Sequence, residues 1–367
     1  MYPKITAQPN IILNTPAFND LHKPAFLGAN GLGEFQGIVN ASGEYDYSGR
    51  LKATVKRNQA LLSSARAGSE IAKRDLIQAV TEAYFNLAFA TVLRRSAEGN
   101  LQSSVDFESY IKLQLDAGEV APVDLVRSRL QTSSRRDELE ISKANESVSA
   151  DSLRVLIGYE FTAPVATEDL LTQMPNDGEI ESYVQTAVES RPEFAQFEAE
   201  KTVAETDVEI AKAERKPQIT YSVSAGFISD SLLPNNIKNS TGIQANVGVT
   251  IPLFDRGGSK SREAQAKLKL QQAENAKKLA EKQYLQAFFS ARTQGLSAAL
   301  RVRQIAAGIK DAEANVAAST ARYQAGEAII NEVFDAQNIL IAQHQAFYQA
   351  IFDYQTARSK LLRAIGK

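Results

Sequence analysis

Cysteine is absent from this sequence of 367 residues, and histidine occurs only twice. The lack of cysteine excludes disulfides, thiolate metal sites, a cysteine nucleophile and lipid attachment through an N-terminal cysteine. His22 and His344 each lack a second histidine nearby, so we predict surface or packing roles rather than metal ligation. No Ser-His-Asp arrangement or cofactor fingerprint can be assembled, and we therefore expect no enzymatic activity, no cofactor and no metal.

Neither sign of charge is in excess, because 41 Lys and Arg stand against 43 Asp and Glu, a formal net charge of −2. This balance leaves no basic footprint for nucleic acid and no acidic tail. We find no run approaching the roughly 20 apolar residues of a membrane helix. That does not exclude a membrane β-barrel, whose strands need only about 9–11 alternating residues. No basic segment followed by an apolar core begins the chain, so we see no signal peptide.

Proline is missing from two long stretches, between Pro24 and Pro122 and after Pro252. Inside a helix proline costs about 3 kcal/mol, so its absence over such lengths is what very long helices require. A helix from about residue 49 to 115 would be near 100 Å long at about 1.5 Å per residue, a rod for which a globular domain has no use. We predict long helices at about residues 49–115, 119–157, 258–322 and 328–365.

Four segments alternate apolar and polar residues with the period of two that is typical of strands. We predict these strands at about residues 3–13, 33–47, 218–228 and 242–254. Their other face carries Thr, Ser, Gln and Asn, which suits a barrel with a polar lumen as well as a half-exposed sheet. We predict loops at 14–32 and Ser229–Ser240. Two shorter helices are predicted within residues 180–214, divided at Pro192.

The same short turn occurs twice, as Asp-Ala-Gly-Glu-Val around Gly118 and as Gln-Ala-Gly-Glu-Ala around Gly326. The two glycines are 208 positions apart, and so are Gly158 and Gly366, where the following helical patterns end. We interpret the chain as a tandem duplication with repeats at 1–158 and 159–367. The shorter helices have no counterpart before the first strand. We therefore expect the first repeat to be N-terminally incomplete, with a natural N-terminus further upstream.

The chain resembles the TolC-like outer-membrane efflux protein family in its order of elements. Two strands, a long helix, a glycine turn and a returning helix occur in this order twice. The segment Ile251-Pro-Leu-Phe-Asp-Arg-Gly-Gly258 is similar to the family's strand-to-helix junction and assigns that role to Pro252, Gly257 and Gly258. The resemblance covers essentially the whole chain. It implies a mainly α fold with a small β part, assembled as a homotrimer. Each chain would give four strands to a twelve-stranded transmembrane β-barrel and its helical hairpins to a hollow α-barrel.

The resemblance also implies a functional site at the two glycine turns, which would lie at the periplasmic tip and dock on an adaptor protein. The implied docking residues are Gly118, Glu119, Gly326 and Glu327. The family narrows its tunnel with acidic residues one helical turn apart, and the matching positions are Glu332 and Asp335. Cross-links that hold the tip closed would involve Tyr323 and Asp124. An arginine that some members carry two residues after the tip glycine is replaced by Ala328.

Simpler interpretations of these residues stay open. Glu332 and Asp335 also suit the first turn of a helix, where acids favour the N-terminus. Tyr323 also suits the apolar seam of a coiled coil. Gly257-Gly258 follows a strand and opens a helix, but the glycine motifs of phosphate-binding loops are absent, so a junction is the better interpretation.

The function that follows is a passive exit duct in the bacterial outer membrane, extending into the periplasm. Its partners would be two further copies of the chain, a periplasmic adaptor, an inner-membrane pump and outer-membrane lipid, but no nucleic acid. Two alternatives remain: the exit duct of a type I protein-secretion system, and a soluble coiled-coil scaffold. The matched pairs of alternating segments argue against the scaffold.

Overall fold

The computed structural model describes residues 3–17, 20–24, 32–168, 174–183 and 191–365. Gly366, the predicted end of the last helix, lies outside these residues. The chain forms two compact units, one of residues 1–65 with 196–276 and one of residues 66–195 with 277–367. Each unit draws residues from both halves of the sequence, so the units do not coincide with the predicted repeats.

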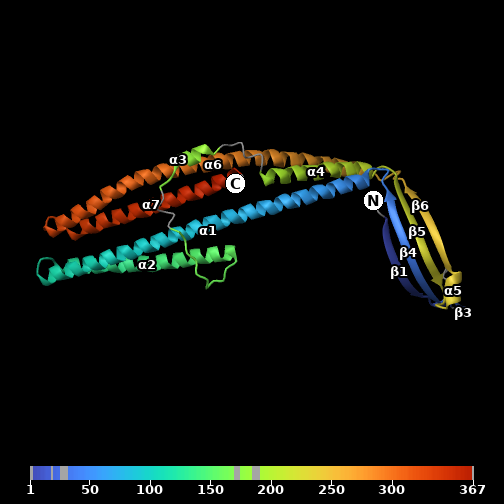
Figure 1. Cartoon of the computed structure of the whole chain (residues 1–367), viewed down its shortest axis with the longest axis horizontal. Helices are drawn as coiled ribbons and strands as arrows, with labels where there is room; N and C mark the ends of the chain where they lie inside the picture. Colours follow the sequence, from blue (N-terminus) through green and yellow to red (C-terminus); the bar gives the residue numbers. More distant parts are fainter. Residues whose placement is uncertain (1–2, 18–19, 25–31, 169–173, 184–190, 366–367) are drawn as a thin grey trace. The chain divides into compact units, whose positions relative to one another are not determined.

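Long helical hairpins are present where proline is absent. Helix α1 covers Arg50–Asp116 and α2 covers Pro122–Ile157, while α6 covers Gly258–Gln324 and α7 covers Ile330–Ala364. In the second unit α2 returns beside α1, and α7 returns beside α6 (Figure 1). Glycine turns connect the helices of each hairpin.

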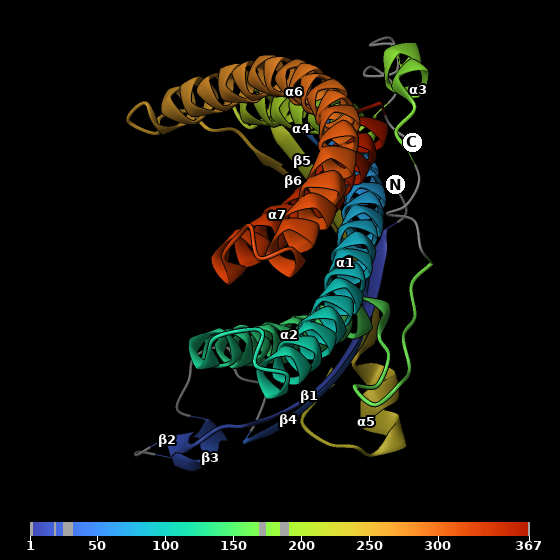
Figure 2. The same ribbon diagram turned by 90° about the vertical axis from the view of Figure 1, so that its left-hand side faces the viewer.

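Helix α1 has apolar neighbours on two sides within the second unit. Ala88 packs with Val302, Ala350 and Ile351 of α6 and α7, while Leu87 packs with residues of α2. Figure 2 shows α1 between α2 and α7. An 18-residue window of α1 has a mean hydropathy of 1.3, enough by length and composition to cross a membrane. Our expectation that no such run exists was wrong, and packing on two sides explains why this helix is apolar on more than one face.

The first unit contains one antiparallel sheet, in the order β1-β4-β5-β6. The strands cover Lys4–Leu13, Gly33–Tyr45, Gln218–Ser229 and Thr241–Thr250. Odd-numbered residues pair only with odd-numbered residues in every ladder, for example Ala41 with both Ile5 and Val223. The odd positions therefore share one face of the sheet.

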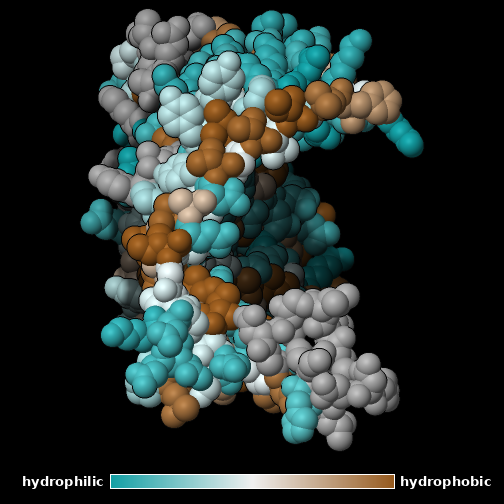
Figure 3. Space-filling model, turned by 90° about the vertical axis from the view of Figure 1, so that its right-hand side faces the viewer, coloured by the Kyte–Doolittle hydropathy of each residue, from teal (hydrophilic) through white to brown (hydrophobic). Residues whose placement is uncertain are grey.

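That odd face is apolar and exposed, whereas the even face carries mostly polar side chains. Ile5, Val247 and Ile243 are 69%, 73% and 80% exposed. Thr6, Asn40 and other polar residues occupy the even positions between them. Figure 3 shows bands of hydrophobic side chains at this end of the structure. Such a sheet suits an apolar environment on its odd face and water on its even face.

Three predicted boundaries in this unit were wrong. The 14–32 connection holds a small hairpin of β2 (Pro16–Ala17) and β3 (Asp20–Pro24), and the loop after β5 holds the short helix α5 (Pro234–Asn239). Pro234 stands at the start of α5, where its missing N–H costs nothing. Strand β6 ends at Thr250 rather than at residue 254, because Pro252 cannot donate to a ladder.

The shorter helices are α3 (Asp177–Ser182) and α4 (Pro192–Ala213). The rest of the predicted first helix, residues 184–190, lies outside the described residues. Ile180 of α3 is fully buried in the largest apolar cluster of the second unit, with Phe288 and Leu361. In the first unit, Asp207 of α4 pairs with Arg57 of α1 at 2.6 Å, and Val208 packs with residues of α6. The shorter helices thus brace the long ones.

Candidate functional site

The two glycine turns have the same geometry. Gly118 and Gly326 adopt φ values of +78° and +74°, the left-handed region in which glycine is favoured. In each turn the glycine N–H donates to the carbonyl three residues earlier, at 2.9 and 3.0 Å. The N–H of the next glutamate, Glu119 or Glu327, donates to the carbonyl five residues earlier, at 2.9 Å in both turns. This is the Schellman pattern, and it leaves both glutamates exposed.

An aromatic cluster lies directly behind the turns and joins the two hairpins. Phe107 of α1 lies with its ring centroid 6.2 Å from that of Tyr323 in α6 and 5.9 Å from that of Phe334 in α7. Ile111 and Val333 are fully buried in the same cluster. Separating the hairpins at this end therefore exposes apolar surface.

Tyr323 and Asp124 lie together across the two hairpins. The Tyr323 hydroxyl donates to Oδ2 of Asp124 at 3.4 Å, a long hydrogen bond, and only 9% of Tyr323 is exposed. Arg127 lies 3.7 Å from the other carboxylate oxygen. Burial, with the charge of Asp124 and the hydrogen bond to it, raises the pKa of Tyr323 to about 12. The phenol therefore keeps its donor proton at neutral pH.

The acidic residues of the second turn are unequal. Glu332 accepts from Arg322 at 2.9 Å, and both side chains are about half exposed. Asp335 is exposed, and within the described residues no cation lies within ion-pair distance of it. Sequence analysis missed Arg322, although it directly precedes Tyr323. The pair leaves Asp335 as the uncompensated one of these two acids.

A second polar contact joins α2 to α7. Arg135 is 6% exposed, and its Nη1 donates to both carboxylate oxygens of Glu138 at 2.8 and 2.9 Å. Its Nη2 donates to Oδ1 of Asn338, which also accepts from Gln131 at 3.4 Å. Sequence analysis missed this contact too. The sequence does contain a signal for a polar contact, because Ser128, Thr132 and Arg135 lie at helical spacing on one face of α2. In the structure all three are buried.

Comparisons with known proteins identify the family of the chain. The family model described as "Outer membrane efflux protein" matches residues 183–367, half of the chain. The chain belongs to the outer membrane efflux protein family. Members of this family are passive conduits of the outer membrane that extend into the periplasm, so this efflux protein is a channel and not an enzyme. They work as trimers with adaptor and inner-membrane pump partners.

Individual relatives are distant in sequence and close in fold. Nodulation protein T of Rhizobium leguminosarum bv. trifolii is 22% identical over 87% of this efflux protein and 68% of the relative. Cation efflux system protein CusC of Escherichia coli K12 is 23% identical over 91% of this chain and 73% of CusC. The crystal structure of VceC from Vibrio cholerae superposes with a TM-score of 0.83 at 17% identity, covering 99% of this chain and 86% of VceC.

Helices α1 and α6 of the efflux protein are each preceded by an aspartate whose carboxylate accepts from backbone N–H groups, and sequence analysis missed both roles. The carboxylate of Asp46 accepts from the N–H groups of Leu51 and Lys52 at 3.0 and 2.8 Å, at the start of α1. Asp255 accepts from the N–H of Gly257 at 3.1 Å, where the chain passes from β6 into α6. The predicted junction residues Pro252, Gly257 and Gly258 lie in this passage. An aspartate followed by glycines at a strand end was the available signal.

The raised pKa of Tyr323 gives a prediction in alkaline solution. Because the folded pKa is about 12 and the ordinary value is 10.0, the folded protein holds this proton over a range in which the unfolded chain has lost it. The contribution of Tyr323 to stability is therefore present below pH 10 and is lost as the pH rises towards 12. A phenolate absorption titration of the wild type minus Tyr323→Phe should show one late-titrating tyrosine. A difference titration curve with its midpoint near pH 10 would contradict the burial of Tyr323.

Proposed function

We propose that the two hairpins close the periplasmic end of this channel and that opening separates α1 and α2 from α6 and α7. The observation that carries the proposal is the hydrogen bond from Tyr323 to Asp124, which links the hairpins beside the glycine turns. The contact of Arg135 with Asn338 supports it further along the same helices. The gate would thus consist of a turn-side contact and a second contact deeper in the hairpins.

The single chain is incomplete as a membrane structure. Strands β1 and β6 are the edges of the four-stranded sheet, and their outer sides have no partner strand within the described residues. A lipid bilayer does not tolerate open edges, because unpaired backbone groups there cannot bond to water. Three copies would close a twelve-stranded barrel with the apolar odd face towards outer-membrane lipid and the polar even face towards the lumen.

We assign adaptor docking to the two glycine turns. All four predicted docking residues are exposed: Gly118, Glu119, Gly326 and Glu327. Because the two turns have the same geometry, a trimer would present six similar turns to the adaptor. Two relatives carry names that specify small cargo, cation efflux for CusC and pyoverdine export for OpmQ. Their names favour an efflux duct for small solutes over a protein-secretion exit, and they differ too much to specify one substrate.

A test of the gate residues uses block of the open channel by multivalent cations. Three copies of Asp335, with Glu332 partly neutralised by Arg322, would form an acidic ring that binds such cations. The double change Glu332→Gln with Asp335→Asn should weaken block by roughly an order of magnitude, because six carboxylates are removed from one ring. Arg322→Gln should strengthen block, since it releases Glu332 from its partner.

The control is Glu140→Gln on α2, an exposed carboxylate paired with Lys143 at 2.8 Å and away from the second turn. It should leave the block unchanged. Equal block in the double variant and the wild type, measured in single-channel recordings, would remove Glu332 and Asp335 from the lumen. A decrease caused by Arg322→Gln would instead show that the arginine does not compensate Glu332.

A further inference from the structure

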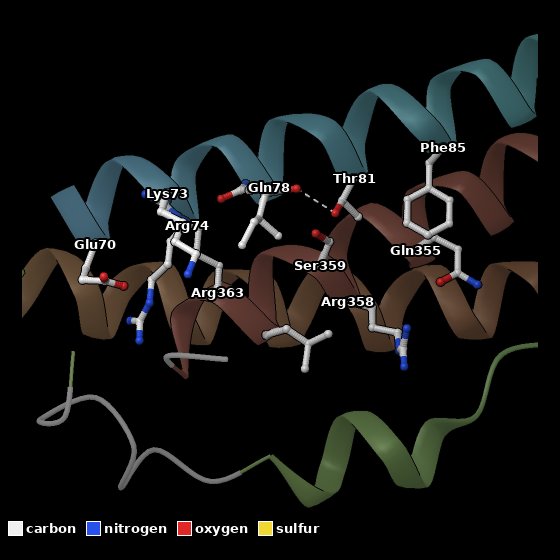
Figure 4. A pocket seen from close by; sticks show the side chains of 12 residues that line it. Glu70, Lys73, Arg74, Gln78, Thr81, Phe85, Gln355, Arg358, Ser359 and Arg363 are labelled. Carbon is white, nitrogen blue, oxygen red and sulfur yellow. Dashed lines mark hydrogen bonds between the residues drawn. The ribbon is translucent and has the colours of Figure 1, made fainter. Parts of the chain in front are cut away.

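A pocket of about 430 Å³ lies between α1 and α7, outside the gate region. Its α1 wall comes from residues 70–85 and its α7 wall from residues 355–363. Figure 4 shows Lys73, Arg74 and Arg363 towards one end, with Glu70 beside them, and Phe85 towards the other end, with Gln355 and Arg358 beside it. The pocket therefore combines a cationic end with apolar lining from Ile77, Leu362 and Phe85, and the one arginine beside Phe85, Arg358, is paired with Glu179.

The cations of the pocket differ in how well they are compensated. Arg358 pairs with Glu179 at 2.6 Å, and Arg363 pairs with Asp75 through Nη2. Among the described residues Arg74 has no carboxylate partner, and its Nη1 is buried without an acceptor. Glu70 also lines the pocket, one helical turn before Arg74, but makes no ion pair with it among the contacts of the described residues.

A fourth guanidinium, that of Arg191, lies next to the pocket and adds to the positive charge there. Arg191 is 4% exposed, and its Nη2 donates to the backbone carbonyl of Arg363 at 2.9 Å. Its own carboxylate neighbour, Glu193, is 3.6 Å away, and Tyr284 lies 4.4 Å from the guanidinium carbon. Burial lowers the pKa of Arg191, and the charges of Arg363 and Arg74 lower it further. The guanidinium groups of Arg191, Arg363 and Arg74 are thus close enough to repel one another.

Within the part of the chain that the structure describes, four buried nitrogens of Arg74, Arg191 and Arg363 have no acceptor: Nη1 of Arg74, Nε of Arg363, and Nε and Nη1 of Arg191. A buried donor without an acceptor costs about 1–3 kcal/mol, and more when the group is charged. Buried polar groups are therefore normally satisfied, and exceptions point to a missing partner. The missing partner here must be an acceptor, and an anion would also relieve the repulsion among the guanidinium groups.

We propose that this pocket binds an amphipathic organic carboxylate. The carboxylate accepts from Arg74 and Arg363 at the cationic end, a geometry for which guanidinium groups are suited. The apolar body lies against Ile77, Leu362 and Phe85. An inorganic oxyanion would fill only a small part of 430 Å³ and would leave the apolar lining residues uncovered.

The test measures binding to the purified trimer in a non-ionic maltoside detergent by calorimetry. The probes are hexanoate, acetate and hexan-1-ol, which separate the two ends of the pocket. Hexanoate should bind about tenfold or more tighter than acetate, because its extra methylene groups leave water. Hexan-1-ol should not bind measurably, because it lacks the charge that the arginines select.

Two variants test the two ends. Arg74→Gln should weaken hexanoate binding by about tenfold, the scale of a lost charge-assisted hydrogen bond. Ile77→Ser should reduce the preference for hexanoate over acetate without affecting acetate, and this position is 56% exposed, so the change is tolerable for folding. The matched control is Arg136→Gln, an exposed arginine of α2 that does not line the pocket.

Equal hexanoate affinity in Arg74→Gln and the wild type would overturn the assignment of the cationic end. Equal affinity for acetate and hexanoate would overturn the amphipathic ligand. No binding of either acid to an intact trimer would overturn the site altogether. None of these outcomes bears on the gate, because Arg74 and Ile77 make no contact with the turn residues.

Discussion

Removing the Tyr323–Asp124 and Arg135–Asn338 contacts between the hairpins should raise the single-channel conductance roughly severalfold, because the tip then opens without a partner protein. The variant combines Asp124→Ala, Tyr323→Phe and Arg135→Met. Each lost hydrogen bond is worth about 0.5–1.5 kcal/mol, and bonds to charged groups about 1.5–3 kcal/mol. A symmetric trimer breaks three sets of contacts on opening, so modest energies in one chain are multiplied by three.

Methionine is chosen at position 135 because the arginine is 6% exposed, and an apolar side chain of similar length avoids a cavity. The control is Arg154→Met, which removes a partly buried arginine of the same helix that pairs with Asp151 at 2.6 Å and has no contact with α7. This control should conduct like the wild type. If the triple variant conducts no better than the control, the two contacts do not hold the tip closed.

The variants also order the two contacts. The Tyr323 to Asp124 bond is long, at 3.4 Å, whereas Arg135 is charged, buried and bonded to two residues. Arg135→Met alone should therefore raise conductance more than Tyr323→Phe alone. The opposite order would make the contact beside the turns the stronger one, despite its length.

Much of the fold could be predicted because its determinants are local. Proline is excluded from helix interiors by its own ring, and glycine is favoured at the positive-φ position that follows the last turn of a helix. The two turns repeat these local rules, which is why Gly118 and Gly326 could be placed from the sequence. The small β2–β3 hairpin and α5 were missed because such short elements leave no periodic pattern.

The site was harder to predict because its contacts join residues far apart in the chain. Arg135 and Asn338 are 203 positions apart, and Tyr323 and Asp124 are 199 apart. Which of them meet depends on how one hairpin is rotated against the other, and periodicity within a single helix does not give that angle. Tyr323 and Asp124 were expected only from the family resemblance. The unsatisfied arginines around Arg74 had no sequence signal.

The sheet contains a glycine whose replacement should have the largest effect on stability. Gly226 of β5 pairs with Ile38 of β4 and with Gly242 of β6. A Cβ at position 226 would lie 2.8 Å from Cα of Ile38 and 2.9 Å from the carbonyl carbon of Gly37, with the Gly37 oxygen closer still. All three are backbone atoms, so no side-chain rotation can relieve the collision.

Gly226→Ala should therefore separate β4 from β5 and cost about 3 kcal/mol or more, at the upper end of overpacking effects. Because a barrel needs every ladder intact, the expected result is loss of the trimer from outer-membrane fractions, measured by its migration on a gel without heating. Gly242→Ala is the matched control: it lies directly opposite on β6, and a Cβ there meets nothing within 4 Å. It should assemble like the wild type, since only the added volume at the β4–β5 ladder meets backbone. Normal assembly of Gly226→Ala would mean that β4 and β5 lie further apart in the membrane than in this sheet.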